Sequence, residues 1–166
     1  MKIVDVIVET PRGSAVKYDY DKATGLFKLK KELPSGMTFP YDFGFIPHTI
    51  GEDGDPLDFL IITAFGNFPG CLVECKVIGC IQAKQKDKKK NTPAVRNDRF
   101  IGIPLVSRLF KNINTIDDLP GDVMKELEAF FVQYNKLEER QFKIMRTTGP
   151  AASFKKIKES LKDAKE

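Results

Sequence analysis

Up to about residue 105 the chain consists of short runs rich in Val, Ile, Phe and Tyr, which Gly, Pro, Asn and Asp interrupt at close intervals. This spacing predicts short β-strands joined by turns, and it favours a closed or partly closed barrel over a series of βαβ units. The predicted strands are residues 3–9, 16–20, 26–31, 57–64, 72–82 and 99–104.

The pattern changes to a helical one from Asp117 onward. After an acidic start, which stabilises a helix N-terminus, apolar side chains recur on one helical face. They are Val123, Leu127, Phe130, Phe131, Tyr134 and Leu137. A second helix is predicted from Pro150 through Leu161, with Phe154 and Ile157 on its apolar stripe and lysines on the other side. The expected fold class is therefore mainly β with C-terminal α-helices, the second of which covers the barrel.

The composition is typical of a single globular domain, residues 1–166, with 42% hydrophobic and 30% charged residues. The net charge of +4 is mild, and acidic residues are interleaved with basic ones outside one lysine-rich stretch. This is weaker than the dense basic footprint of a nucleic-acid-binding domain, but it suits a small anionic ligand. The sequence also lacks a repeat of fixed period and a Walker-type glycine loop.

Three cysteines, Cys71, Cys75 and Cys80, lie on one apolar stretch. Their odd number and the lack of a paired His/Cys set predict buried thiols in a reducing compartment rather than disulfides or a zinc site. The N-terminal segment is too short and too interrupted for a signal peptide, and no stretch approaches the length of a membrane span. We therefore expect a soluble cytoplasmic protein with no membrane partner.

Three aspartates, Asp53, Asp55 and Asp58, lie within six positions directly before the apolar run 59–64. Carboxylates this close repel one another and raise one another's pKa, so they stay ionised in a folded protein when a cation is shared among them. A hard divalent metal such as Mg²⁺, with Mn²⁺ as the alternative, is the natural candidate. A plain turn, in which Asp caps the backbone and Gly and Pro set the dihedrals, explains the same residues. An EF-hand loop is excluded, because a loop starting at Asp53 would place Ala64 where the bidentate Glu belongs.

Cations that could accompany such a metal are Lys17, Lys31 and Arg99. On the predicted strand 16–20 the two-residue period places Lys17 and Asp19 on one face, which is either solvated or part of a site. Tyr134 is either a core aromatic or a phenol that hydrogen-bonds a phosphate. Glu9 is either an exposed strand end or an inward carboxylate. Metal ions with cations for the phosphate are what phosphoryl transfer requires.

The lysine-rich segment 84–91 lies between two predicted strands, where a hairpin loop is expected. This segment is either a solvated loop tip or a positively charged surface that attracts anions or contacts a partner chain.

Between about Val6 and Leu137 the sequence resembles the soluble family I inorganic pyrophosphatases. The most specific part is 52–58, which reproduces the Asp-Gly-Asp-Pro-x-Asp signature of that family. Further motifs follow in the family order: Glu9-Thr10-Pro11, Lys17-Tyr18-Asp19, the segment 39–47, Pro69-Gly70-Cys71, Gly79, Asn97-Asp98-Arg99 through Pro104, Asp118-Leu119-Pro120 and the segment 130–134.

The resemblance implies an OB-like five-stranded barrel flanked by two α-helices, with several Mg²⁺ ions and pyrophosphate at its mouth. By this resemblance Asp53 and Asp58 bind metals, and Asp55 helps to deprotonate the water shared between them. The residues expected to hold phosphate are Lys17, Lys31, Arg99 and Tyr134. The family's reaction is the hydrolysis of pyrophosphate to two orthophosphates, and its bacterial members are commonly hexamers.

The sequence departs from the family pattern at two further metal positions. Gln85, or the nearby Lys84 or Lys86, occupies the position of an Asp at the end of the long strand, and Asp87 can substitute for that Asp only if the loop folds inward. Asn97 occupies another ligand position. Asp98 lies one residue over and is the candidate third metal ligand, on the condition that a bulge re-aims its side chain.

The phosphate-binding positions also differ from the family pattern. Lys31 replaces Arg, Phe39 and Phe43 replace Tyr, Asn135 replaces Lys, and Asp19 replaces Glu. Lys lacks the bidentate fork of Arg, and Phe cannot donate a hydrogen bond.

The leading hypothesis is a Mg²⁺-dependent inorganic diphosphatase. The alternative, motivated by these substitutions, is a degenerate member of the same fold that binds phosphate or a partner without hydrolysis. An OB-type single-strand binder is a third hypothesis. The aspartates expected at the barrel mouth argue against it, because they would repel a nucleic-acid backbone.

Overall fold

The computed structural model describes residues 1–161 of the chain. Within them the chain forms nine strands, two α-helices and one short 3-10 helix. In chain order these are β1 (Ile3–Thr10), β2 (Val16–Asp21), β3 (Leu26–Glu32), β4 (Asp42–Ile46), β5 (Leu57–Ile61), β6 (Leu72–Asp87), β7 (Val95–Arg96), β8 (Arg99–Pro104), the 3-10 helix η1 (Ile116–Asp118), α1 (Gly121–Leu137), β9 (Arg140–Thr148) and α2 (Pro150–Glu159).

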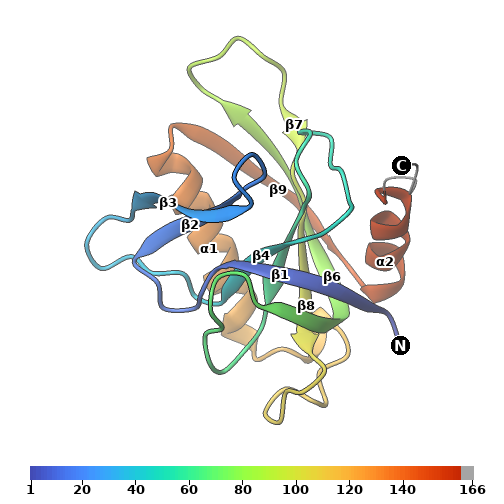
Figure 1. Cartoon of the computed structure of the whole chain (residues 1–166). Coiled ribbons are helices and arrows are strands. Elements are labelled where there is room, and N and C mark those ends of the chain that lie inside the picture. The colour runs from blue at the N-terminus through green and yellow to red at the C-terminus, as the bar shows by residue number, and fades with distance from the viewer. Residues whose placement is uncertain (162–166) are drawn as a thin grey trace.

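Five strands close into a ring, which confirms the predicted barrel. β1, β4, β5, β8 and β6 are each hydrogen-bonded to the next, and β6 pairs again with β1. The pairing of β5 with β8 is parallel, and the other four are antiparallel. β6 is 16 residues long and continues beyond the ring, where it pairs with β7 and β9. The β2–β3 hairpin forms a separate two-stranded sheet (Figure 1).

Two apolar clusters hold the barrel to its helices, because successive side chains of a strand point to opposite faces. One cluster takes side chains from all five strands of the ring, among them Val6, Phe59 and Phe100, together with Ile157 of α2. The other lies on the opposite face and includes Leu60, with Leu127 and Phe131 of α1. α2 therefore covers the barrel as expected, and α1 packs on a different side of it (Figure 1).

All six predicted strands are present; β8 has the predicted ends, and the other five differ at one end. The strand predicted at 57–64 ends at Ile61, and the one predicted at 72–82 continues to Asp87. The lysine-rich segment is therefore partly strand, and the loop that follows covers residues 88–94. Three strands were missed: the two-residue β7, β4 and β9. β4 is fully buried with a glycine at its centre, and β9 shows little alternation, so neither has the pattern of a half-buried strand.

The two predicted helices are also present. α1 begins at Gly121, later than expected, because Asp117 and Asp118 belong to η1 and Pro120 precedes the helix. α2 begins at Pro150 in its first turn, as predicted. In the described part of the chain, neither helix combines the length and apolarity needed to cross a membrane.

The cysteines are free thiols in the structure. Cys75 and Cys80 are buried as expected, whereas Cys71 is partly exposed. Burial raises the pKa of the Cys75 and Cys80 thiols, so both remain protonated and unreactive.

Candidate active site

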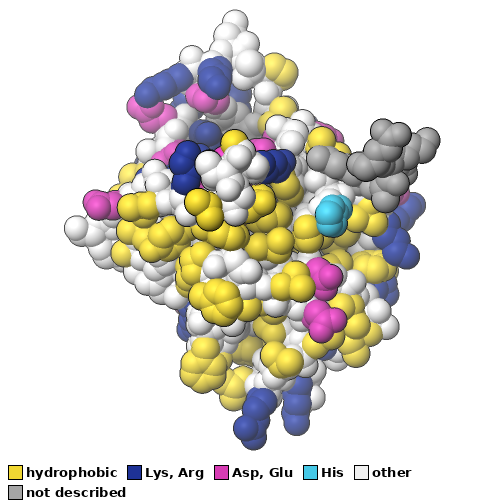
Figure 2. Space-filling model, viewed as in Figure 1, with side chains coloured by type: hydrophobic (Ala, Val, Ile, Leu, Met, Phe, Trp, Pro, Cys, Tyr) yellow, Lys and Arg dark blue, Asp and Glu magenta, His cyan; other side chains and the backbone are white. Residues whose placement is uncertain are grey.

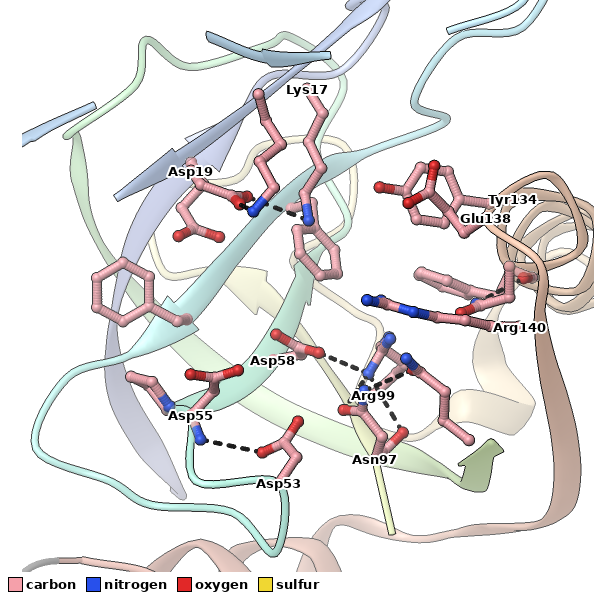
Figure 3. Close-up of a pocket in the computed structure, with 18 of the residues that line it drawn as sticks. Lys17, Asp19, Asp53, Asp55, Asp58, Asn97, Arg99, Tyr134, Glu138 and Arg140 are labelled. Carbon is pink, nitrogen blue, oxygen red and sulfur yellow. Dashed lines mark hydrogen bonds and ion pairs between the residues drawn. The ribbon is translucent and has the colours of Figure 1, made fainter. Parts of the chain in front are cut away.

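A pocket of about 920 Å³ opens at the mouth of the barrel. Its walls come from the β2–β3 hairpin, the loop before β5, the far end of β6, the start of β8, the end of α1 and the start of β9. Seven of the eight residues predicted to form the site line it (Figure 3). They are Lys17, Lys31, Asp53, Asp55, Asp58, Arg99 and Tyr134.

The three aspartates form one acidic wall of the pocket. The loop turns at Gly54, whose φ of +86° lies in the left-handed region that glycine adopts without strain. Asp53 Oδ1 accepts a hydrogen bond of 3.1 Å from the backbone N–H of Asp55. The turn and the metal-site interpretations are therefore compatible, because the same turn directs carboxylates into the pocket.

Burial and neighbouring charges perturb two of these carboxyls. Burial raises the pKa of Asp53, and the charges of Asp58 and Asp55 raise it further. Burial also raises the pKa of Asp58, and the cations Arg99 and Lys17 offset this only in part. A divalent cation would relieve this cost by stabilising both ionised forms.

Arg99 faces Asp58 because the two residues are register partners on the parallel strands β5 and β8. Their side chains form an ion pair, with 2.5 Å between Arg99 Nη1 and Asp58 Oδ2. The guanidinium lies against the rings of Phe43, Phe131 and Phe142. Because these rings offer no acceptor, the buried Nε of Arg99 has no hydrogen-bond partner among the described residues.

The β2–β3 hairpin supplies the cationic wall. Lys17 and Lys31 are register partners, and both ammonium groups lie near the ring of Tyr134, 5.9 and 4.2 Å from its centroid. Lys17 Nζ lies 3.1 Å from Asp19 Oδ1, and Lys31 Nζ lies 2.5 Å from Glu138 Oε1. Burial lowers the pKa of Lys17, but Tyr134, Asp19 and Asp58 together raise it above its ordinary value, so Lys17 is charged.

Two amide side chains, those of Gln85 and Asn97, line the pocket beside Arg99. Asn97 Nδ2 donates a hydrogen bond of 2.7 Å to Gln85 Oε1, and Asn97 Oδ1 accepts one of 2.5 Å from Arg99 Nη1. The positions where the family resemblance leads one to expect carboxylates are thus neutral and bonded to each other.

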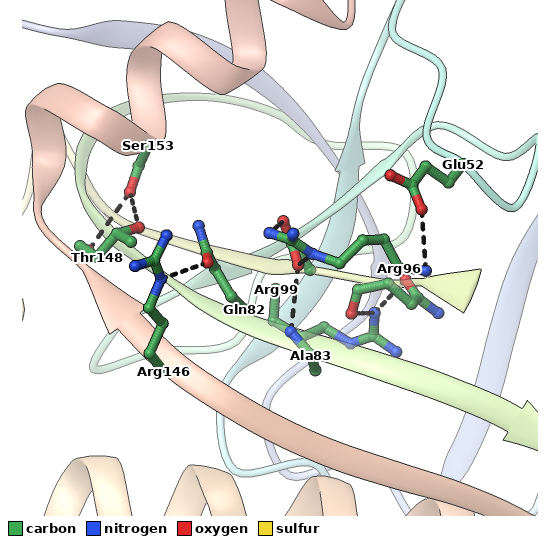
Figure 4. A network of polar contacts seen from close by, with 10 residues as sticks. Glu52, Gln82, Ala83, Arg96, Arg99, Arg146, Thr148 and Ser153 are labelled. Carbon is green, nitrogen blue, oxygen red and sulfur yellow. Dashed lines mark hydrogen bonds and ion pairs between the residues drawn. The ribbon is translucent and has the colours of Figure 1, made fainter. Parts of the chain in front are cut away.

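Asp98 is not brought to the pocket. β7 and β8 pair with β6 in the same register on either side of Asp98, without the bulge that would re-aim its side chain, so Asp98 points away from the face of Asn97 and Arg99. Its carboxylate is buried and accepts two hydrogen bonds from Arg96, of 2.8 and 2.9 Å, and a third from the Ala83 backbone N–H. Figure 4 shows Arg96 and Ala83 in this network. The prediction of Asp98 as a metal ligand is therefore not supported by its position.

Sequence reasoning left Glu9 undecided, and the structure turns it inward. Its Oε1 accepts a hydrogen bond of 3.0 Å from the Tyr20 backbone N–H, and it lines the pocket. Burial, opposed by that hydrogen bond and reinforced by the charge of Asp19, raises the pKa of Glu9 to about 7.

Two other pocket residues, Glu138 and Arg140, were missed. Both follow the last apolar position of α1, in a charged stretch that carries no motif. Only their place between α1 and β9 brings them to the pocket.

The donor set of the acidic wall fits a hard metal ion, because it consists of carboxylate oxygens. Within residues 1–161, however, no three Asp, Glu, His or Cys side chains converge as a preformed metal cage. Mg²⁺ commonly keeps several waters and uses one or two carboxylates together with substrate phosphates. The arrangement therefore suits a metal that arrives with its substrate.

Comparisons with known proteins agree with this geometry. The family model described as inorganic pyrophosphatase matches residues 6–165. The inorganic pyrophosphatase of Geobacillus stearothermophilus is 36% identical over 160 residues, covering 96% of this chain and 93% of that protein. The Thermus thermophilus enzyme is 37% identical over 148 residues, 89% of this chain and 81% of its own length.

A solved structure shows the same relationship. The crystal structure of inorganic pyrophosphatase from Thermus thermophilus superposes with a TM-score of 0.87 at 31% identity, over 96% of this chain and 90% of that one. The chain belongs to the inorganic pyrophosphatase family.

Proposed function

We propose that this protein hydrolyses inorganic pyrophosphate to two orthophosphates in a Mg²⁺-dependent reaction. The observation that carries the proposal is the pocket itself, in which the carboxylates of Asp53, Asp55 and Asp58 face the cations Lys17, Lys31 and Arg99. Hydrolysis of a phosphoanhydride needs both sets, one for metal and water and the other for the phosphates.

Asp53 and Asp58 are the residues that would hold the metal, and Mn²⁺ is the alternative ion. When bound, the metal supplies positive charge that lowers the pKa of water and neutralises the phosphates. Asp55 is exposed in the pocket and accepts the proton of the attacking water. The water oxygen forms a new bond to one phosphorus, the bridging P–O bond breaks, and its electron pair stays on the leaving phosphate.

Lys17, Lys31, Arg99 and Tyr134 hold the two phosphates. Lys31 and Arg99 are already paired with Glu138 and Asp58, so phosphate oxygens replace carboxylate oxygens as their partners. Because each cation exchanges one anionic partner for another, neither cation is left unpaired when the substrate binds.

A phosphate-release assay with Mg²⁺ and Mn²⁺ tests this proposal. The wild type should release orthophosphate from pyrophosphate, and Asp55→Asn or Asp58→Asn should lose most of the rate, on the order of 100-fold or more. Asp5→Asn is the matched control, because Asp5 is exposed on β1 outside the pocket. A wild type that is inert with Mg²⁺, Mn²⁺ and Co²⁺ would refute the enzymatic proposal.

The neutral pair Gln85–Asn97 favours a second candidate function, a phosphate-binding member that does not turn over. Calorimetry that shows pyrophosphate binding together with a negative release assay would establish it. Nucleic acid is not expected to bind, because the pocket wall carries the three aspartates. A retarded band in a gel shift at low salt would contradict that expectation.

We also propose that copies of the chain associate into a homo-oligomer, a hexamer by the family resemblance. The protein is further proposed to work in the cytoplasm. Large apolar side chains are exposed on the turns that follow β5 and β8, with Phe65 80% and Leu109 73% accessible. Figure 2 shows hydrophobic side chains over β1 and the turn after β5. Apolar surface of this kind is typical of interfaces. Light scattering coupled to size exclusion should give a multiple of 18.7 kDa, and a monomer at micromolar concentration would contradict the assembly.

A further inference from the structure

Arg140 extends into the pocket from its edge. It is the first residue of β9, and it follows Glu139, whose positive φ of 57° turns the chain from α1 into the strand. Figure 3 shows its guanidinium directed toward the centre of the pocket, between Tyr134 and Arg99. The backbone of Arg140 is anchored by the pairing of β9 with β6, where its register partner is Asp87.

The inner cations of the pocket already have anionic partners. Lys17 is paired with Asp19, Lys31 with Glu138 and Arg99 with Asp58. Among residues 1–161, Arg140 forms neither an ion pair nor a side-chain hydrogen bond, and the carboxylate of Asp87 accepts the backbone N–H of Lys89 instead. Arg140 therefore contributes positive charge to the pocket that no carboxylate of the described chain offsets.

Two other cations on the pocket rim, Lys22 and Lys90, are also unpaired within the described residues. Both lie in turns or loops and offer an ammonium point charge. Arg140 differs because it stands on a strand and carries a planar fork that matches two oxygens of one phosphate. The neighbouring Asn135 cannot replace it, since its amide is buried and donates to the Phe131 carbonyl.

We propose that Arg140 is a substrate-binding residue that grips the terminal oxygens of the phosphate lying toward α1, on the side of the pocket away from Asp53 and Asp55. This inference rests on the proposed function and adds a residue to it. Arg99 binds phosphate only after it exchanges a partner, because its Nη1 is paired with Asp58 and Asn97 and its side chain is buried. Arg140 is exposed and needs no partner exchange before it binds.

Arg140→Gln tests the proposal by removing the charge while keeping a polar side chain of similar length. We expect the KM for pyrophosphate to rise about tenfold or more, which is typical for the loss of a charge-assisted bidentate contact, with a smaller change in kcat. Arg140→Lys should recover part of the loss, because it restores the charge without the fork.

Arg146→Gln is the matched control. Arg146 lies on the same strand, is exposed, and donates a hydrogen bond of 2.9 Å to Gln82 Oε1 outside the pocket (Figure 4). It changes the net charge by the same amount, so a purely long-range effect of charge would appear in both variants. The midpoint of thermal unfolding should be unchanged in Arg140→Gln, since the side chain makes no contact that holds the fold.

Calorimetry with the non-hydrolysable analogue imidodiphosphate and Mg²⁺ measures binding without turnover. Weaker binding in Arg140→Gln than in both the wild type and Arg146→Gln supports the proposal. Equal binding in Arg140→Gln and the wild type, or equal losses in the two variants, overturns it. If the wild type releases no orthophosphate, the proposed function fails while the binding comparison still decides the role of Arg140.

Discussion

The charged residues of the pocket are paired with one another before any substrate binds. Lys31 with Glu138 and Arg99 with Asp58 are cations held by carboxylates that compete with phosphate. These carboxylates neutralise the two cations in the free protein, but they also weaken the attraction of the cations for phosphate. The affinity of the site for pyrophosphate therefore depends both on the new contacts to phosphate and on the ion pairs that break when it binds.

Glu138→Gln should strengthen pyrophosphate binding, because it leaves Lys31 without its carboxylate partner. Both side chains are partly exposed, at 23% and 32%, so the pair contributes at most about 1 kcal/mol. The dissociation constant should fall by about two- to fivefold in calorimetry. Glu126→Gln, on the exposed side of α1, is the control and should bind as the wild type does. Weaker binding in Glu138→Gln would show that Glu138 has another role.

Asn97→Asp should tighten divalent metal binding, because it adds a carboxylate to the pocket beside Arg99 and Gln85. Metal affinity rises with the charge of the ligand set. We expect roughly a tenfold lower dissociation constant for Mn²⁺ in calorimetry. Asn112→Asp adds the same charge at an exposed loop position outside the pocket and should leave metal binding unchanged. An unchanged affinity in Asn97→Asp would show that position 97 does not reach the metal.

At the scale of elements, β4 and β9 show why the sequence pattern missed two of the three unpredicted strands. β4 is buried along its whole length and pairs with β1 and β5 on its two sides. Its alternation is therefore hidden, and Gly44 at its centre weakens the signal further. Gly44 is required there because an added Cβ would lie 2.1 Å from the Ile7 carbonyl oxygen.

Gly44→Ala should destabilise the barrel by about 2–3 kcal/mol, since the contact is with rigid backbone and the β1–β4 pairing must shift. Urea unfolding followed by circular dichroism measures the loss. Gly121→Ala is the control, because nothing lies within 4 Å of its added Cβ. If the two variants unfold at the same urea concentration, β1 and β4 are less tightly packed than the structure indicates.

At the scale of the whole molecule, the site depends on closure of the ring. The residues of the pocket come from segments spread between Glu9 and Arg140, and they meet because β6 passes from the ring to β9 while the hairpin and α1 stand at the same mouth. A pocket assembled in this way couples the ionisation of its residues to global stability.

The stability of the metal-free protein should fall as pH rises, through Glu9. Its folded pKa of about 7 lies above the ordinary value of 4.5, so the folded state holds a proton that the unfolded state releases. This contribution is complete below about pH 4.5 and is lost as pH rises through 7. Glu9→Gln should flatten the profile between about pH 5 and 8 by roughly 1–2 kcal/mol, allowing for partial exposure.

Urea unfolding in EDTA at several pH values gives both profiles. The comparison with Glu9→Gln isolates this carboxyl from Asp53, Asp58 and Asp19, whose pKa values are also shifted. Parallel profiles for the wild type and Glu9→Gln would contradict the assignment.

Local chemistry was enough to predict the barrel strands with clear alternation or apolar runs, the two helices and the aspartate turn. Lys17, Lys31, Arg99 and Tyr134 were proposed through the family resemblance, and all four line the pocket. Asp98 shows the limit, since a shift of one residue reverses the direction of a strand side chain and only the observed pairing of β6 with β8 decides it.

Tertiary structure alone decided which charges meet. The pairing of Asp58 with Arg99, the inward turn of Glu9, the amide pair of Gln85 and Asn97, and the arrival of Arg140 all join positions distant in sequence. The aspartate cluster of the sequence therefore predicts a metal site. The cations and amides facing it are selected by the closure of the ring, because contacts between remote segments leave no local pattern.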